Sequence, residues 1–283
     1  MTKEIPIVAR SVAAMRKEVE EWRRAGDVVG VVPTMGALHD GHLALVRAAK
    51  AECDRVIATI FINPTQFAAD EDLDAYPRGE VEDLAKLREL ETDLAFMPGA
   101  GEMYPDGFAT KVRVDGITEV LCGFGRPVHF GGVATVVSKL FNQSQADRAY
   151  FGEKDYQQFL VVRRMARDLD IPIEVVPVPT VREADGLAMS SRNVYLSSEQ
   201  RAVAPALYRV IRDVAARVVD GISAEAAVGW GQEELATCGF DSIEYLEVLE
   251  AEMLGPIDFP SKPGRVFVAA HLGSTRLIDN VAV

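Results

Sequence analysis

The stretch VVGVVPTMGALHDGHLALVRAAKAECDRVIATIF, residues 28–61, decides the fold. It begins with the apolar run Val28–Val32, which is typical of a strand buried on both faces. Apolar residues then recur at the spacing of one helix face from Leu43 to Cys53, and a second strand pattern follows over Arg55–Phe61. Because crossovers of this kind are right-handed, the pattern predicts two parallel strands joined by a helix.

The same alternation of helix and strand patterns continues to about residue 180. Further helices are predicted over 81–90, 133–141 and 155–169, and further strands over 93–97, 148–151 and 174–178. Alternation at this spacing predicts an α/β fold with a Rossmann-like, doubly wound parallel sheet.

The pattern changes near Pro179. From Ser197 to about Leu235 the sequence is mostly helical, and two short strand patterns follow over 242–248 and 265–271. We therefore predict two domains: a Rossmann-like domain over residues 1–180, and a second, smaller α+β domain over 181–283.

Composition and charge exclude several classes of function. The 283 residues are 48% hydrophobic and 26% charged, as in ordinary globular proteins. With 43 acidic against 30 basic residues, the net charge of −13 disfavours binding to nucleic acid. No GxGxxG motif follows the first strand, which disfavours an NAD-dependent enzyme.

The cysteines and the apolar runs indicate the compartment. Cys53, Cys122 and Cys238 are far apart and form no CxxC motif, which fits a reducing compartment. The N-terminal residues carry no long apolar core, and no apolar run approaches the roughly 20 residues that span a bilayer. We expect a cytoplasmic protein without a membrane partner.

The turn after the first strand carries a candidate phosphate site, the HxGH motif His39–His42. Ligands of open α/β sheets bind at the carboxyl ends of the strands, and a helix start there attracts phosphate. Gly36 and Gly41 allow close approach to the backbone. His39 and His42 can both donate to charge that develops on a transferring phosphoryl group.

Two other interpretations of the histidine pair remain open. The rings could cap the helix or lie in solvent, or they could share a metal ion, since residues three apart lie on one helix face. No carboxylate or thiol with ligand spacing accompanies them, which disfavours zinc. Two of only four histidines fall in this one motif, so we rank nucleotide binding above both alternatives.

The HxGH motif at this place resembles the nucleotidylyltransferase superfamily, which includes the class I aminoacyl-tRNA synthetases. The longer string PTMGALHDGHLALVRAAK resembles the signature of the pantothenate synthetase family more specifically. Five further segments, in order, are similar to that family: FINPTQF (61–67), DLDAYPR (72–78), RPVHFGGVATVV (126–137), FGEKDYQQ (151–158) and DGLAMSSRNVYLS (185–197). The resemblance covers residues from about 30 to 200. It implies that the domain over residues 1–180 binds the nucleotide and pantoate, and that the domain over 181–283 serves as a lid.

The resemblance implies a two-step reaction. The carboxylate of pantoate attacks the α-phosphorus of ATP, giving pantoyl adenylate and pyrophosphate, and β-alanine then attacks the acyl carbon, giving pantothenate and AMP. It implies catalytic roles for His39, His42 and Lys154, with His42 as a proton donor. The ATP-binding set that it implies is Met35, Gly36, Ala37, Leu38, His39, Asp40, Gly41, His42, Gly152, Glu153, Lys154, Asp155, Val181, Met189, Ser190, Ser191 and Arg192.

Two of these segments have plainer interpretations. Glu153–Asp155 could be a solvated helix start, where acidic residues are common because of the helix dipole. Ser190–Arg192, which the resemblance implies is a mobile loop with good phosphate donors, could be an ordinary turn before Asn193.

The resemblance also implies a set of residues for pantoate and β-alanine. Neutral amides such as Gln66 and Gln158 can hold a hydroxy acid without charge repulsion. Valines on a helix are more often core than ligand wall, so core packing remains open for three of the set. The residues are Pro33, Thr34, Met35, Gln66, Val133, Val136, Val137 and Gln158.

ATP chemistry implies Mg²⁺, which neutralises phosphate charge. The resemblance places a metal-associated acid at Asp83, although a solvated helix face is the interpretation we favour for it. A homodimer is expected from the family and from the prevalence of two-fold oligomers.

Three rival functions fit the sequence less well. A cytidylyl- or adenylyltransferase would share HxGH but not FGEKDYQQ or FINPTQF. A nucleotide-binding regulator would tolerate the loss of His42 or Lys154, and both are present. A protein acting on tRNA is disfavoured by the negative charge and the lack of a basic extension.

Overall fold

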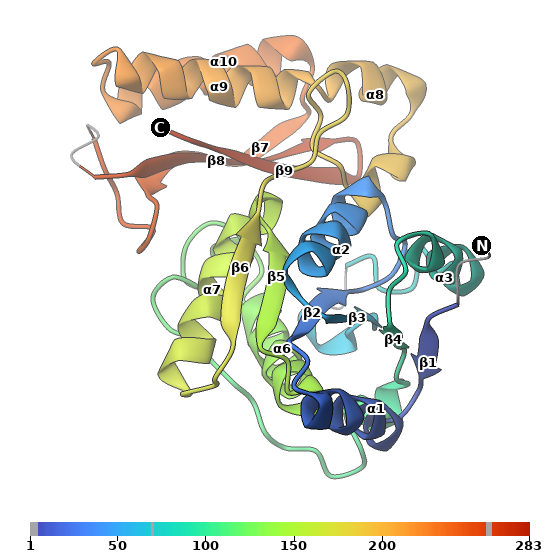
Figure 1. Cartoon of the computed structure of the whole chain (residues 1–283). Helices are drawn as coiled ribbons and strands as arrows, with labels where there is room; N and C mark the ends of the chain where they lie inside the picture. The colour runs from blue at the N-terminus through green and yellow to red at the C-terminus, as the bar shows by residue number, and fades with distance from the viewer. Residues whose placement is uncertain (1–4, 69–70, 259–261) are drawn as a thin grey trace. The chain divides into compact units, whose positions relative to one another are not determined.

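The computed structural model describes residues 5–68, 71–258 and 262–283. The chain divides into two compact units (Figure 1). The N-terminal unit consists of Met1–Glu119, Gly123–Glu153 and Gln157–Pro179. The C-terminal unit consists of Thr180–Val283 and two short pieces from earlier in the chain, Val120–Cys122 and Lys154–Tyr156.

The N-terminal unit is built on a six-stranded sheet in which every adjacent pair is parallel. The strand order is β1-β4-β3-β2-β5-β6. The strands are β1 (Ile7–Ala9), β2 (Val29–Thr34), β3 (Arg55–Ile60), β4 (Leu94–Phe96), β5 (Arg148–Gly152) and β6 (Glu174–Val178). This architecture confirms the predicted Rossmann-like, doubly wound sheet.

The helices of this sheet are mostly those that the sequence predicts. They are α1 (Val12–Ala25), α2 (Asp40–Glu52), α3 (Glu80–Glu89), α4 (Ala100–Met103), α5 (Cys122–Gly125), α6 (His129–Ser144) and α7 (Tyr156–Asp168), with the 3-10 turns η1 (Pro64–Gln66) and η2 (Glu153–Asp155). One detail differs: α2 buries Leu45, Val46 and Ala49, whereas Leu43 is only half-buried. Val46, Ala49 and Cys53 of the predicted face are buried as expected, so the prediction errs only in naming Leu43 in place of Leu45.

The order in which strands are added to the sheet reverses between β2 and β5. From β2 the chain proceeds outward to β3 and β4, and it then returns to place β5 on the other side of β2. In open parallel sheets, ligands bind at the carboxyl ends of the strands beside such a reversal. The HxGH turn follows β2 and the segment Glu153–Asp155 follows β5, so the topology selects the same two segments as the motifs.

The C-terminal unit is an antiparallel sheet of β7 (Ser242–Glu250), β8 (Gly264–Leu272) and β9 (Thr275–Ala282), with β8 in the centre. It confirms the predicted α+β character. Helices α9 (Ala206–Val219) and α10 (Ala224–Cys238) cover one face of the sheet (Figure 1). The unit also contains η3 (Ser191–Tyr195) and α8 (Ser198–Val203).

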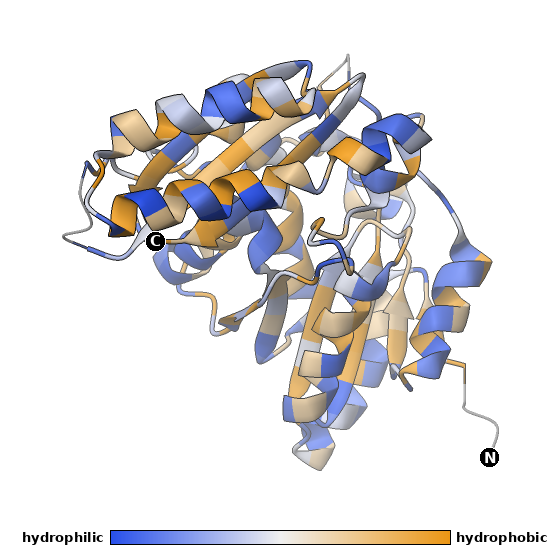
Figure 2. Ribbon diagram, turned by 90° about the horizontal axis from the view of Figure 1, so that it is seen from above, coloured by the Kyte–Doolittle hydropathy of each residue, from blue (hydrophilic) through white to orange (hydrophobic). Residues whose placement is uncertain are grey.

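Packing in the C-terminal unit follows the hydropathy pattern. Helix α9 buries Leu207, Val210, Ile211 and Val214 on one stripe. Figure 2 shows hydrophobic and hydrophilic residues alternating along the two long helices, as expected for helices with one face on a sheet. Among the described residues, no helix combines the length and the apolar character that crossing a bilayer requires.

The sequence did not predict β1, β9, α1 or the short helices α4 and α5. Strand β1 has only three residues and pairs with β4 at the sheet edge. Helix α1 begins at an N-cap, Ser11, whose hydroxyl accepts from the backbone of Ala14 at 3.2 Å. The helix buries Met15, Val19 and Trp22, a stripe at helical spacing within a strongly charged sequence.

Helix α6 contacts η1 through a glycine. A Cβ added at Gly132 would lie 2.4 Å from the carbonyl oxygen of Thr65 and 2.6 Å from the Cα of Gln66. Both atoms belong to the backbone, so they cannot swing aside as a side-chain end could. The adjacent Gly131, on the same helix, would meet nothing within 4 Å. Only Gly132 is required for this close approach.

We expect Gly132→Ala to lower the free energy of unfolding by about 1–3 kcal/mol, because the backbone of η1 must move. Gly131→Ala is the matched control, and it should be neutral or stabilising by up to about 1 kcal/mol through helix propensity. Chemical denaturation of both variants measures the difference. Equal unfolding free energies for the two variants would contradict the packing described here.

Candidate active site

The turn that follows β2 has an unusual backbone. Gly36 has φ +83° and Ala37 has φ +50°, so two successive residues adopt the left-handed conformation. Thr34 supports the start of the turn, since its hydroxyl donates to the carbonyl of Thr59 at 2.5 Å and accepts from Gly36 N–H at 3.2 Å. Pro33 and Thr34, which lie beyond the predicted first strand, are the last two residues of β2.

Asp83 of α3 holds this turn from the opposite side. Its Oδ2 accepts from Ala37 N–H at 2.9 Å, and its Oδ1 accepts from Leu38 N–H at 2.7 Å. Successive N–H groups in such a turn form an anion-binding concavity, and here the anion is a side chain of the protein. Asp83 is 2% exposed, so the interpretation as a solvated helix face is wrong.

The environment of Asp83 has opposing electrostatic effects. Burial raises the pKa of the carboxyl group above its ordinary value, while the N–H groups of Leu38 and Ala37 act in the other direction. Lys86, one turn further along α3, donates from Nζ to the carbonyl oxygen of Leu38. Helix α3 therefore holds both the N–H and the C=O groups of the turn.

The two histidines of the motif act on each other and on the helix start. His39 is the N-cap of α2, and its Nδ1 accepts from Gly41 N–H at 3.1 Å. His42 Nδ1 accepts from His39 N–H at 3.4 Å, and the ring centroids are 4.1 Å apart. The capping interpretation is thus confirmed as local geometry.

This capping determines which nitrogen carries the proton. A ring nitrogen that accepts from a backbone N–H has no proton of its own, so a neutral His39 or His42 carries its proton on Nε2. Each neutral ring then has its N–H group at Nε2. At the helix start, where we expected phosphate to bind, the Gly41 N–H is used by His39.

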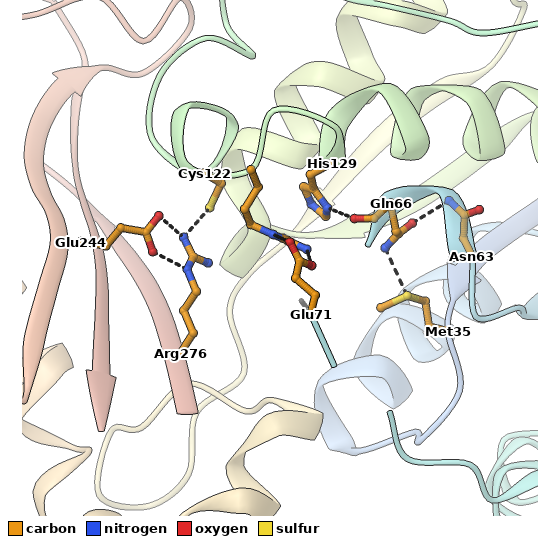
Figure 3. Close-up of polar contacts among 9 residues, drawn as sticks. Met35, Asn63, Gln66, Glu71, Cys122, His129, Glu244 and Arg276 are labelled. Carbon is orange, nitrogen blue, oxygen red and sulfur yellow. Dashed lines mark hydrogen bonds and ion pairs between the residues drawn. The ribbon is translucent and has the colours of Figure 1, made fainter. Parts of the chain in front are cut away.

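Gln66, predicted to bind pantoate, is held in one orientation (Figure 3). Asn63 Nδ2 donates to its Oε1 at 3.0 Å, so its Nε2 is the end that points away, toward Met35 Sδ at 3.2 Å. A thioether is a weak acceptor. A ligand carboxylate or hydroxyl would be a better partner for this amide, and Gln66 and Met35 both belong to the predicted ligand set.

Three residues outside the predicted set organise Gln66. Asn63 is 1% exposed, and its Oδ1 accepts from the hydroxyl of Tyr104 at 2.7 Å. His129 Nδ1 lies 3.0 Å from the backbone oxygen of Gln66, and it is the donor because a carbonyl only accepts. Asn63 and His129 stand inside the motifs FINPTQF and RPVHFGG, so the sequence carried a signal for them. Tyr104 lies outside every motif.

The other predicted pantoate residues lie on helices of the same unit. Val133, Val136 and Val137 are buried in α6, at 2%, 6% and 4% exposure, which agrees with core packing. Gln158 is half-buried in the first turn of α7. A role of these four residues in binding a substrate stays a prediction.

A partly buried ion pair lies three residues before His129. Arg126 donates to both carboxylate oxygens of Glu71, with Nε 2.8 Å from Oε1. Burial alone would raise the pKa of Glu71, but the Arg126 guanidinium outweighs it and holds that pKa below its ordinary value. Glu71 is therefore ionised at neutral pH, and the pair fixes the segment before α6.

The segment after β5 is shared between the two units. Gly152 and Glu153 belong to the N-terminal unit, and a Cβ added at Gly152 would meet only Leu45, at 4.0 Å. Lys154 and Asp155 belong to the C-terminal unit. The side chain of Lys154 is 18% exposed, with Nζ 3.9 Å from Asp155 Oδ2, so a solvated helix start does not describe it.

The remaining predicted ATP residues form a folded-back segment in the C-terminal unit. Met189 N–H donates to the carbonyl of Val181 at 3.0 Å, and Gly186, with φ +96°, allows the reversal between them. Ser190 caps η3, where its hydroxyl accepts from Arg192 N–H at 3.3 Å. Ser190–Arg192 thus has the geometry of a capped turn, and its contact with phosphate stays a prediction.

The structure therefore gathers the predicted residues into two groups. The HxGH turn, Gln66 and Asp83 are linked by direct contacts within the N-terminal unit. Lys154, Asp155 and the segment 181–192 belong to the C-terminal unit. Among the described residues there is no group of three or more His, Cys, Asp or Glu side chains arranged to hold a metal ion.

Comparisons with known proteins cover nearly the whole chain. Residues 7–282 match the model of the family described as pantoate-beta-alanine ligase. The pantothenate synthetase of Dinoroseobacter shibae is 57% identical over 278 residues, which is 98% of this chain and 99% of that protein. The pantothenate synthetase of Caulobacter vibrioides is 57% identical over 281 residues, with the same coverage.

Solved structures agree with the sequence comparison. The crystal structure of pantothenate synthetase from Thermus thermophilus has a TM-score of 0.92 and 49% identity, and covers 97% of this chain and 98% of its own. Pantoate-beta-alanine ligase from Francisella tularensis, in complex with beta-gamma ATP and beta-alanine, has a TM-score of 0.83 and 32% identity. The match covers 98% of this chain and 97% of that chain.

We expect Asp83→Asn to lower the free energy of unfolding by about 1–3 kcal/mol, because its amide NH₂ would face a buried backbone N–H donor. The exposed Glu82→Gln, one residue earlier in α3, is the matched control and should change little. Chemical denaturation at neutral pH compares them. An Asp83→Asn protein as stable as the control would show that the carboxylate does not hold the turn.

Proposed function

The chain belongs to the pantoate–β-alanine ligase family, whose activity is the ATP-dependent condensation of pantoate with β-alanine, and we propose that it performs this reaction through pantoyl adenylate at the HxGH turn. The alternatives of a nucleotide-binding regulator and of an enzyme acting on tRNA have no counterpart among these relatives. The Francisella tularensis relative, crystallised with beta-gamma ATP and beta-alanine, supports the choice of substrates.

The chemistry explains why ATP is required. A bare carboxylate is a poor acyl donor, because its leaving group would be oxide. In the first step a carboxylate oxygen of pantoate bonds to the α-phosphorus while the bond to the bridging oxygen breaks and pyrophosphate leaves. In the second step the amine of β-alanine bonds to the acyl carbon, the bond from that carbon to the AMP oxygen breaks, and the amine loses a proton.

The observation that carries the site assignment is the orientation of the histidine pair. Both rings accept backbone N–H groups at Nδ1, which fixes their orientation after the carboxyl end of β2 and places the proton of each neutral ring on Nε2. Donors that are fixed in advance stabilise charge on a transferring phosphoryl group without reorganisation. We assign this role to His42 and, beside it, to His39.

The acid substrate is assigned to the amide of Gln66. Asn63 holds the Oε1 end, so the Nε2 donor points toward the weak acceptor Met35 Sδ. A neutral donor binds the pantoate carboxylate without neutralising it, so its nucleophilicity toward phosphorus is retained. Gln158, the three valines of α6, Pro33 and Thr34 complete the proposed substrate wall.

The phosphates of ATP are assigned to cationic and hydroxyl groups of the C-terminal unit. Lys154 would supply a fixed positive charge, and Ser190, Ser191 and Arg192 would supply further donors. The proposed ATP set also keeps Met35–His42 and Gly152–Asp155, together with Val181 and Met189. In an acidic protein, these groups provide the local positive field that a triphosphate needs.

Magnesium is proposed as the partner of ATP rather than as a resident ion. The described residues offer no cluster of three acidic or histidine ligands, and both oxygens of Asp83 already accept backbone N–H groups. This donor set fits an ion that is held mainly by the phosphate oxygens and water, as is common for Mg²⁺. When bound, the ion would neutralise phosphate charge.

We also propose a cytoplasmic homodimer. None of the three cysteines, all in the described part of the chain, forms a disulfide, which supports a reducing compartment. The homodimer rests on the general prevalence of two-fold assemblies. Light scattering that returned the mass of one chain would contradict it.

The function is tested by omitting one substrate at a time. We expect AMP formation only when ATP, pantoate and β-alanine are all present, and ATP–pyrophosphate exchange with pantoate alone. Exchange without β-alanine is the result that requires an acyl-adenylate. AMP release that is independent of pantoate would defeat the proposed reaction.

The role of His42 is tested by two substitutions that separate its functions. His42→Ala removes both the acceptor for His39 N–H and the Nε2 donor, whereas His42→Asn can keep the acceptor through Oδ1. If the donor matters, both variants lose about 10²-fold or more in single-turnover pyrophosphate release. Recovery of the wild-type rate in His42→Asn would reduce His42 to a helix cap.

A further inference from the structure

Strand β9 contains two adjacent polar residues, Asp279 and Asn280, each 3% exposed. Asp and Asn are depleted in strands, and buried polar groups need hydrogen-bond partners. Successive residues of a strand point to opposite faces of the sheet. A buried Asp-Asn pair in β9 therefore makes two separate sets of contacts, one on each face.

Asn280 contacts the segment that carries Lys154. Its Nδ2 donates to the backbone oxygen of Lys154 at 3.0 Å, and its Oδ1 accepts from Nε of Arg265. Only one orientation of the amide satisfies both contacts, because a carbonyl cannot donate and a guanidinium cannot accept. The side chain of Asn280 is therefore fixed at both ends.

The same segment has a second attachment two residues later. The guanidinium carbon of Arg265 lies 4.0 Å from the centre of the Tyr156 ring, and that ring lies 6.0 Å from the ring of Phe267. Arg265 and Phe267 belong to β8, next to β9. Residues 154–156 are thus held on the C-terminal sheet at Lys154 and again at Tyr156.

Asp279 contacts the start of the other predicted phosphate-binding segment. Its two oxygens accept from Arg182 Nη1 at 2.6 Å and Nη2 at 2.9 Å. Arg182 also donates to the carbonyl of Gly186 at 3.1 Å, and its guanidinium stacks 3.6 Å from the Tyr208 ring. Paired planar contacts of this kind fix direction as well as distance.

We propose that Asp279 and Asn280 are positioning residues, which set the placement of Lys154 and of the segment leading to Ser190–Arg192 relative to each other. Adjacent Cα atoms are about 3.8 Å apart, so one strand holds both segments through neighbouring side chains. Neither residue touches a substrate in this proposal. It rests on the proposed function, in which Lys154 and Ser190–Arg192 contact the phosphates of ATP.

The central experiment is Asn280→Asp, assayed by pantoate-dependent ATP–pyrophosphate exchange. The substitution places an oxygen against the Lys154 carbonyl but retains an acceptor for Arg265. We expect the KM for ATP to rise, or kcat to fall, by about tenfold, since small misplacements of a catalytic group are costly. The KM for pantoate should remain close to that of the wild type.

The matched control is Asn142→Asp on α6. Asn142 is exposed, and its Nδ2 also donates to a backbone oxygen, that of Ser138 at 2.8 Å. The Asn142→Asp variant loses the same kind of hydrogen bond at a position outside the proposed ATP-binding segments. Its kinetics should therefore match those of the wild type. Asn280→Ser is made in parallel, because a neutral, smaller residue is tolerated where a buried second acid could prevent folding.

A double-mutant cycle separates positioning from stability. If Asn280 acts through Lys154, the variant Lys154→Ala with Asn280→Asp should be no slower in exchange than Lys154→Ala alone. Multiplicative losses, or wild-type ATP kinetics in both Asn280 variants, would overturn the proposal. If Lys154→Ala itself leaves exchange unchanged, the proposed role of Lys154 fails instead, and the two failures are thereby distinguished.

Asp279 is tested through its own segment. Asp279→Asn replaces one of the two oxygens that pair with Arg182 by an NH₂ group that cannot accept. We expect a rise of about tenfold in the KM for ATP. The same substitution should raise this KM less in a protein that already carries Arg182→Lys. An unchanged KM for ATP in a folded Asp279→Asn protein would remove Asp279 from the proposal.

Discussion

The pairing of the Asp83 carboxylate with the N–H groups of Ala37 and Leu38 is the contact on which the candidate site depends. It lets two successive residues keep left-handed backbone angles, one of them a non-glycine residue. Positive φ at a non-glycine residue persists only when surrounding contacts enforce it. The carboxylate is buried, so its desolvation is offset only while those two N–H groups face it. The turn and the acid therefore stabilise each other, and His39 begins its helix where this turn ends.

The fold then determines where the chemistry can occur. The reversal of strand order between β2 and β5 places the HxGH turn and the segment carrying Lys154 after adjacent parallel strands. Within the N-terminal unit, the second organising group is Asn63, which joins Tyr104, Gln66 and the backbone of Gly132. A glycine at 132 allows α6 to approach closely enough for this network. Specific donors and acceptors are thus oriented by residues that need not touch a substrate.

Periodicity predicted the parallel sheet because buried strands and amphipathic helices leave strong patterns over many residues. It erred where a single contact outweighs the pattern. Asp83 looks like a solvated helix acid, since nothing local shows that a turn 45 residues away supplies its partners. Strand β9 was missed because Asp279 and Asn280 interrupt its apolar character. The HxGH motif located the histidines, but which ring nitrogen faces the backbone follows from cap geometry alone.

The two residues of β9 that the sequence patterns missed have partners that are distant in the chain. Asn280 bonds to Lys154, 126 positions earlier, and Asp279 bonds to Arg182, 97 positions earlier. A motif records residues that act side by side in sequence, whereas positioning is a property of the folded chain. Lys154 illustrates the difference, because it follows β5 directly and yet is held by side chains of the C-terminal sheet. The last strand of the protein, which carries no motif, therefore holds two segments of the C-terminal unit at once, through Lys154 and through Arg182.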